Sequence, residues 1–136
     1  MREVFADTHY WIAIINPSDQ WAAAAKTAKD KLGTVRLVTT DEVLTEFLTA
    51  LALYGEHLRQ IAVRATRAIL QNPNVSVVPQ TRQSFLEGVD LYEGRKDKQY
   101  SLTDCISMAT MKNRGIAEVL TNDHHFVQEG FVVLIK

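Results

Sequence analysis

Residues 4–15 read VFADTHYWIAII, and this stretch indicates the class of fold. The apolar run from Val4 to Ala6 predicts a short buried strand, and Asp7-Thr8 offers an N-cap for an apolar helix over residues 10–15. A strand that leads directly into a helix is the building unit of α/β folds. The Asp7 carboxylate is therefore expected at the carboxyl end of a strand, where open α/β sheets place their sites.

The same alternation continues along the chain. Helical patterns cover residues 21–31, 42–54, 57–70, 81–93 and 101–114, and strand patterns cover residues 35–38, 75–78, 119–120 and 131–135. A polar loop is expected at 94–100, and a turn at Asn122-Asp123. These elements predict an α/β fold with a mostly parallel central sheet, helices on both faces and right-handed crossovers.

Composition limits the classes of protein to consider. With 136 residues, 46% of them hydrophobic, we expect one domain over residues 1–136. The 15 basic and 16 acidic residues give a net charge of −1, so any affinity for nucleic acid must be local. The single cysteine, Cys105, excludes an intrachain disulfide and is interpreted as a buried small hydrophobic residue. No signal peptide or membrane span is apparent, so a soluble, cytoplasmic protein is expected.

Three acidic residues have structural explanations. Asp7 is placed to cap a helix, and Asp123 follows Asn122 in a turn. Ser101-Leu102-Thr103-Asp104 matches a capping box, in which Ser101 is the N-cap and Asp104 the third helical residue. Considered one at a time, these residues need no function.

Glu46 is harder to explain structurally. Its neighbours on the helix at three, four and seven residues are Val43, Ala50 and Leu53, so its carboxylate lies in or beside an apolar stripe. An unpaired buried carboxylate is costly, and the same helix offers no Lys or Arg. Glu46 therefore requires a cation or a basic residue from elsewhere in the fold.

Convergence of the four carboxylates would imply a divalent ion, because without one they would repel each other. Carboxylate oxygens suit Mg²⁺, or alternatively Mn²⁺, and such an ion supports phosphodiester hydrolysis by activating water and stabilising charge on phosphoryl oxygens. Asp7 and Asp104 are our candidates for direct ligands. Glu46 and Asp123 are expected to hold metal-bound waters or a second ion, and to orient the attacking water.

The local motifs resemble those of PIN-domain ribonucleases, particularly VapC-type toxins of toxin–antitoxin systems and their solitary relatives. The resemblance extends over essentially the whole chain. It is carried by Asp7-Thr8 with Tyr10-Trp11, by Glu46 within VLTEFLTAL (43–51), by YSLTDCIS (100–107), and by Ile116 with LTNDHHF (120–126).

This resemblance implies a three-layer α/β/α sandwich and metal-dependent endoribonuclease activity on RNA. It also implies a homodimer that, in toxin members, binds an antitoxin protein. Asp7, Glu46, Asp104 and Asp123 match the acidic tetrad, and the supporting hydroxyl groups would be those of Thr8, Ser101 and Thr121. His124 departs from the pattern, since many relatives have Arg or Lys there.

Other residues allow weaker inferences. Arg95, Lys96 and Lys98 precede Ser101 and are candidate phosphate contacts, although a solvated charged loop explains them equally well. Trp11 and Trp21 fall in apolar helical patterns and are interpreted as core or dimer-contact residues. His124-His125 lacks the spacing of a zinc site.

Three alternatives to an RNA toxin remain open. One is a signalling module resembling receiver domains, although Asp7 is not paired with a second acid after its strand. Another is a non-catalytic dimerising interaction protein whose acids are structural, which would bind no metal. The third is a related nuclease specific for structured DNA or RNA.

Overall fold

A five-stranded parallel sheet forms the centre of the molecule. The computed structural model describes residues 1–136, and the strands follow the order β3-β2-β1-β4-β5 with every neighbouring pair parallel. The strands are β1 (Glu3–Ala6), β2 (Arg36–Thr40), β3 (Val75–Val78), β4 (Glu118–Leu120) and β5 (Val132–Val133). The predicted mostly parallel sheet is confirmed, and no strand is antiparallel.

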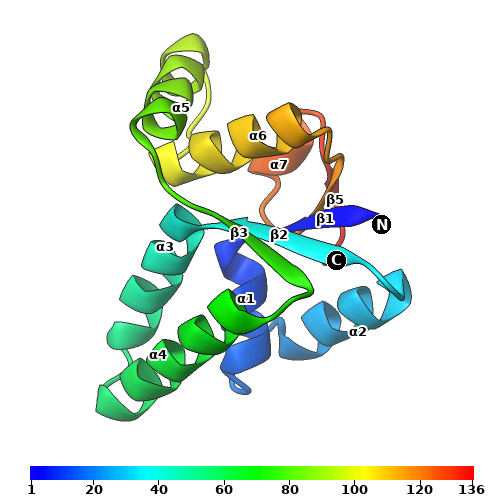
Figure 1. The fold of residues 1–136 in the computed structure, drawn as a ribbon, viewed down its shortest axis with the longest axis vertical. Helices are drawn as coiled ribbons and strands as arrows, with labels where there is room; N and C mark the ends of the chain where they lie inside the picture. The colour runs from blue at the N-terminus through cyan, green and yellow to red at the C-terminus, as the bar shows by residue number, and fades with distance from the viewer.

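Seven helices cover the two faces of this sheet. They are α1 (Thr8–Ile15), α2 (Ala22–Leu32), α3 (Asp41–Ala52), α4 (Glu56–Gln71), α5 (Arg82–Gly94), α6 (Leu102–Arg114) and α7 (His125–Gln128). Figure 1 shows α1 to α4 on one side of the sheet and α5 to α7 on the other. This is the expected three-layer α/β/α sandwich. No helix is both long enough and apolar enough to cross a membrane.

The strand order creates a switch point beside the central strand. From β1 the chain adds β2 and β3 on one side, and later adds β4 and β5 on the other. The Asp7 N–H donates to the Leu120 carbonyl at 3.3 Å, so the carboxyl ends of β1 and β4 lie next to each other. Crevices at such positions are the usual sites of open α/β sheets, because the connections leave the two strands in opposite directions.

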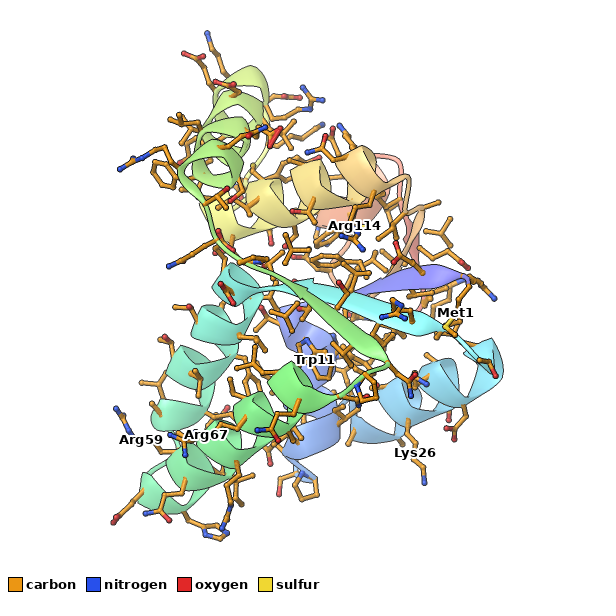
Figure 2. All side chains as sticks on the ribbon, in the orientation of Figure 1. Met1, Trp11, Lys26, Arg59, Arg67 and Arg114 are labelled. Carbon is orange, nitrogen blue, oxygen red and sulfur yellow. The ribbon has the colours of Figure 1, made fainter.

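The core contains the residues that the apolar patterns indicated. Val4, Phe5 and Ala6 have no exposed surface, and Cys105 is likewise fully buried. Trp11 is buried, and its indole N–H donates to the Thr39 hydroxyl at 3.3 Å. Arg59 and Arg67 of α4 are exposed, and Figure 2 labels both at the end of the molecule where α3 and α4 lie.

The main differences from the sequence-based expectation lie at the carboxyl-terminal end. The short helix α7 was not predicted, because four residues are too few to show helical periodicity. The last strand is regular only over Val132–Val133, although the N–H groups of Leu134 and Ile135 still donate to β4 and to Thr121 just beyond it. Elsewhere element ends differ by one or two residues; for example, α1 begins at Thr8 rather than Tyr10.

Candidate active site

A cleft of about 690 Å³ opens at the carboxyl ends of β1 and β4. The cleft brings together all four predicted carboxylates and two of the predicted hydroxyl groups. These lining residues are Asp7, Thr8, Glu46, Ser101, Asp104 and Asp123. They come from four separate parts of the chain, so the convergence that the sequence argument required is present in the fold.

Asp7 follows β1 and occupies the N-cap position of α1, but its side chain makes no capping hydrogen bond. Instead, the Thr121 hydroxyl donates to Asp7 Oδ2 at 2.9 Å and accepts the Asp123 N–H at 3.1 Å. One hydroxyl group thus fixes the positions of two carboxylate-bearing residues. The helix-capping explanation of Asp7 is wrong, and its carboxylate faces the cleft.

Asp104 does belong to the predicted capping box. The Ser101 hydroxyl accepts the Asp104 N–H at 3.0 Å, and Asp104 Oδ2 accepts the Ser101 N–H at 3.1 Å. This reciprocal pair orients the carboxylate at the start of α6, where it lines the cleft. The structural interpretation and the site interpretation of Asp104 are therefore compatible.

Glu46 lies in α3 and accepts a hydrogen bond from the Thr8 hydroxyl. No Lys or Arg forms an ion pair with any of the four carboxylates. The basic residue that could have compensated Glu46 is absent, which leaves a cation as the remaining partner.

The electrostatics of the cleft reflect this lack of compensation. Burial, with a further contribution from Asp104, raises the pKa of Asp7 to about 7. Burial also raises the pKa of Glu46 and of Asp104, and the nearby Asp123 carboxylate raises both further. Clustered carboxylates with raised pKa values are held for a function more often than for stability.

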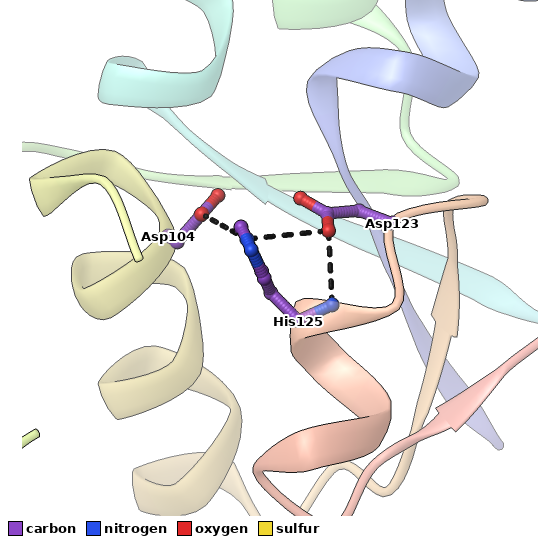
Figure 3. Close-up of side chains that lie close together, drawn as sticks. All are labelled: Asp104, Asp123 and His125. Atoms are coloured by element: carbon purple, nitrogen blue, oxygen red, sulfur yellow. Dashed lines mark hydrogen bonds and ion pairs between the residues drawn. The ribbon is translucent and has the colours of Figure 1, made fainter. Parts of the chain in front are cut away.

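His125 is a site residue that the sequence argument missed. Its Nδ1 lies 3.5 Å from Asp104 Oδ2 and 3.3 Å from Asp123 Oδ1, and its ring packs against Tyr100 with centroids 5.4 Å apart. Figure 3 shows the imidazole between the two carboxylates. The spacing of His124 and His125 argues against a zinc finger but does not address a site that a histidine shares with carboxylates. The sequence does contain a signal for His125 as a site residue, because it lies two residues after Asp123 in a turn at the end of a strand.

Other residues that were not predicted also line the cleft. His9 Nδ1 accepts the Asn122 N–H at 3.1 Å, and the Trp21 ring meets His9 edge-on at 5.8 Å. Burial lowers the pKa of His9. Trp21 is only half-buried; it packs against the core and also lines the cleft beside Asp19.

The three predicted phosphate contacts lie just outside the cleft. Arg95, Lys96 and Lys98 line a neighbouring depression, and Gln99 lines both this depression and the cleft. The guanidinium of Arg95 is engaged by Glu129 at 2.8 and 2.7 Å, whereas Lys96 is exposed. Lys98 is half-buried and pairs with Asp97 at 3.2 Å, so Lys96 is the least engaged of the three basic residues. RNA contact remains a prediction for all three.

A divalent ion fits this set of residues. The donors are mainly carboxylate oxygens, which hard cations prefer. The Nδ1 atom of His125 is buried without a hydrogen-bond partner, and the carboxyl groups beside it have raised pKa values. A cation among Asp104, Asp123 and His125, whose ligand atoms lie within 4.8 Å of one another, would relieve both features.

Comparison with known proteins identifies relatives over nearly the full length. The chain is 27% identical over 129 residues to the 23S rRNA-specific endonuclease VapC20 of Mycobacterium tuberculosis, covering 95% of each chain. The crystal structure of VapC20, described as a Sarcin-Ricin loop cleaving toxin, aligns with a TM-score of 0.86 and 29% identity over 95% of this chain and 96% of that one.

More distant structures share the fold. FitAcB from Neisseria gonorrhoeae aligns with a TM-score of 0.70 and 16% identity, covering 96% of each chain. DNA-bound VapBC from Salmonella typhimurium aligns with a TM-score of 0.68 and 15% identity, over 98% of this chain and 97% of that chain.

The family model of the PIN domain matches residues 4–131, a range that includes all four carboxylates and His125. Together with the parallel sandwich and the full-length similarity to VapC20, this match confirms the resemblance noted in the motifs. The chain belongs to the PIN domain family.

Proposed function

We propose that this protein is a Mg²⁺-dependent endoribonuclease that hydrolyses RNA phosphodiester bonds, and that it is the toxin of a toxin–antitoxin pair. The observation that carries the proposal is the set of four carboxylates in one cleft with no Lys or Arg to neutralise them. Such a site is built for a cation, and a cation in a cleft this open leaves room for a phosphate group.

In this proposal Asp7 and Asp104 would hold the ion directly. Glu46 and Asp123 would hold metal-bound waters or a second ion, and would help to orient the water that attacks the phosphate. The bound ion would supply polarisation of the phosphoryl oxygen and a more acidic water. Mn²⁺ is the alternative cofactor, because it accepts similar oxygen ligands.

The supporting hydroxyl groups keep these carboxylates in place. Thr121 fixes Asp7 and the turn that bears Asp123, while Ser101 orients Asp104 through the capping box. Thr8 donates to Glu46. Because the hydrogen bonds form within the protein, the carboxylates need little reorganisation when charge develops on the substrate.

The substrate and partners follow from the relatives. VapC20 is named as an endonuclease for 23S rRNA, and its similarity over the full length supports RNA as the substrate. Lys96 and Lys98 beside the cleft would contact the backbone phosphates. Another relative in fold is a toxin–antitoxin complex from Klebsiella pneumoniae, which supports an antitoxin partner here; we also propose a homodimer.

The test is cleavage of a panel of single-stranded and structured RNAs by the purified protein with Mg²⁺, with Mn²⁺ and with EDTA. Asp104→Asn is the informative variant, and Asp90→Asn, on the exposed face of α5, is the matched control. We expect metal-dependent cutting that Asp104→Asn abolishes and Asp90→Asn retains. No cutting by folded protein under any condition would instead favour a non-catalytic dimerising interaction or signalling module.

A further inference from the structure

The imidazole of His125 is positioned to bind a metal ion. Its Nδ1 atom is buried and has no hydrogen-bond partner, although carboxylate oxygens of Asp104 and Asp123 lie at 3.5 and 3.3 Å. A buried nitrogen between two acids must either carry a proton for one of them or share a cation with both. Figure 3 shows that all three side chains converge on one small volume.

The contact geometry favours the shared cation. An N–H on Nδ1 would have to point at one oxygen, yet neither contact satisfies the geometry of a hydrogen bond. Ligands about 2.1 Å from one metal ion, at angles of about 90° to 110°, lie roughly 3.0 to 3.4 Å apart. The separations of 3.3 and 3.5 Å from Nδ1 to the two oxygens are close to that range.

The ring is also held in this orientation by the protein itself. The backbone N–H of His125 donates to Asp123 Oδ1 at 2.9 Å, which fixes the start of α7. The Tyr100 ring packs against the imidazole, and the Tyr100 hydroxyl in turn donates to Glu129 at 3.1 Å. Nδ1 is therefore directed toward the carboxylates before any ion binds, as expected of a preorganised ligand.

We infer that Asp123 contacts the divalent ion directly rather than only through water, that His125 Nδ1 is a further ligand beside Asp104 and Asp123, and that this nitrogen makes the site prefer Mn²⁺ to Mg²⁺. The inference rests on the metal site of the proposed function. Mg²⁺ is a hard ion that favours oxygen ligands, whereas an imidazole nitrogen strengthens the binding of transition-metal ions. A site made only of carboxylates would lack this selectivity.

The experiment measures metal binding directly, without RNA. Isothermal titration of the full chain with MnCl₂ and with MgCl₂ gives both affinities, and pulsed electron paramagnetic resonance of the Mn²⁺ complex detects a coordinated ¹⁴N nucleus. The variants are His125→Gln and, as a matched control, His124→Ala, because His124 is adjacent but exposed. Circular dichroism checks that each variant is folded.

We expect a ¹⁴N coupling in the wild-type complex that His125→Gln removes and His124→Ala retains. His125→Gln should weaken Mn²⁺ binding by about 10-fold or more but Mg²⁺ binding by less than about 3-fold. Absence of the ¹⁴N signal, or an equal change for both metals, would overturn the inference and leave the carboxylate site intact. If Asp104→Asn also left metal binding unchanged, the proposed function itself would fail.

Discussion

Two buried carboxylates in this protein have opposite environments. Glu129, just after α7, accepts hydrogen bonds from Arg95, Lys112 and Tyr100 at 2.7 to 3.1 Å, and Arg95 is the largest cause that lowers its pKa, to about 2. Asp7 receives a side-chain hydrogen bond only from Thr121, and burial raises its pKa to about 7.

The difference separates a structural acid from a candidate catalytic acid. The charge of Glu129 is neutralised within the chain, and it ties the 94–100 loop and α6 to the end of α7. The charge of Asp7 is not neutralised, so the folded protein without metal carries an electrostatic cost at the cleft. A bound cation would remove that cost. Five experiments test this difference between the neutralised Glu129 and the uncompensated acids of the cleft.

The largest expected effect is on RNA cleavage. Asp7→Asn should lower the single-turnover rate constant by at least about 100-fold, because Asp7 is a proposed direct ligand of the metal ion. Glu129→Gln should lower it by less than about 10-fold, since Glu129 acts only through the neighbouring loop. Quenched-flow or gel assays with one labelled RNA measure both; similar losses in the two variants would erase the proposed distinction.

The effects on stability should have the reverse order, with a larger loss in Glu129→Gln than in Asp7→Asn. Glu129→Gln should reduce the free energy of unfolding by about 2 kcal/mol, a value lowered from that of a fully buried pair because Arg95 and Lys112 are partly exposed. Asp7→Asn in EDTA should cause no loss. Urea denaturation followed by circular dichroism gives both values, and a larger loss for Asp7→Asn would contradict the assignment.

The two acids also predict opposite pH dependences in EDTA. The pKa of Asp7 is raised on folding, so stability should fall as pH rises from about 4 toward 7, on the order of 4 kcal/mol by pH 8. The pKa of Glu129 is lowered, so its contribution is present above about 4.5 and is lost as pH falls toward 2. Together these two groups place the maximum of stability at about pH 4.

Thermal unfolding across this pH range tests which group causes the loss of stability at alkaline pH and which causes the loss at acid pH. The alkaline loss should be smaller in Asp7→Asn, with the remainder due to Glu46 and Asp104, and it should disappear on addition of Mg²⁺. The acid loss should be smaller in Glu129→Gln. An alkaline loss that Asp7→Asn leaves unchanged would show that another group causes it.

A smaller effect is expected at Thr121, which links Asp7 to the Asp123 turn. Thr121→Val keeps the shape of the side chain but removes both hydrogen bonds, and should lower cleavage by about 10-fold through misplacement of the carboxylates. Thr66→Val, a change to a half-buried hydroxyl on α4 away from the cleft, is the control. Equal activity of both variants would argue against a positioning role.

The smallest effect concerns Glu46. Glu46→Gln should raise the free energy of unfolding in EDTA by about 1 kcal/mol or less, because it removes an uncompensated, partly buried charge while leaving an acceptor for Thr8. The same variant should lose RNA cleavage. A clear loss of stability would mean that the Glu46 charge is already compensated.

Much of the fold could be predicted because its signals are local. The strand–helix junction at Asp7 and the capping box at Ser101 and Asp104 depend on residues a few positions apart, and both are present as elements of the structure. The proximity of Asp7 and Asp123 also followed from sequence, since parallel strands end at one edge of a sheet. Glu46 and Asp104 lie on helices, and only the resemblance to PIN-domain ribonucleases placed them with the other two. The helix α7 was missed because its signal is a single turn.

The amino-acid sequence was sufficient to predict the layers, the parallel sheet and the position of Asp7 and Asp123 at one edge of it. Which acids are neutralised depends on the tertiary structure. Glu129 accepts hydrogen bonds from residues 17 to 34 positions away in the sequence, whereas Asp7 and Glu46 accept side-chain hydrogen bonds only from hydroxyl groups. The tertiary structure also placed His125 between Asp104 and Asp123. The reason is physical: hydrophobic periodicity acts along the chain, whereas the energy of a charge depends on distance and burial in three dimensions.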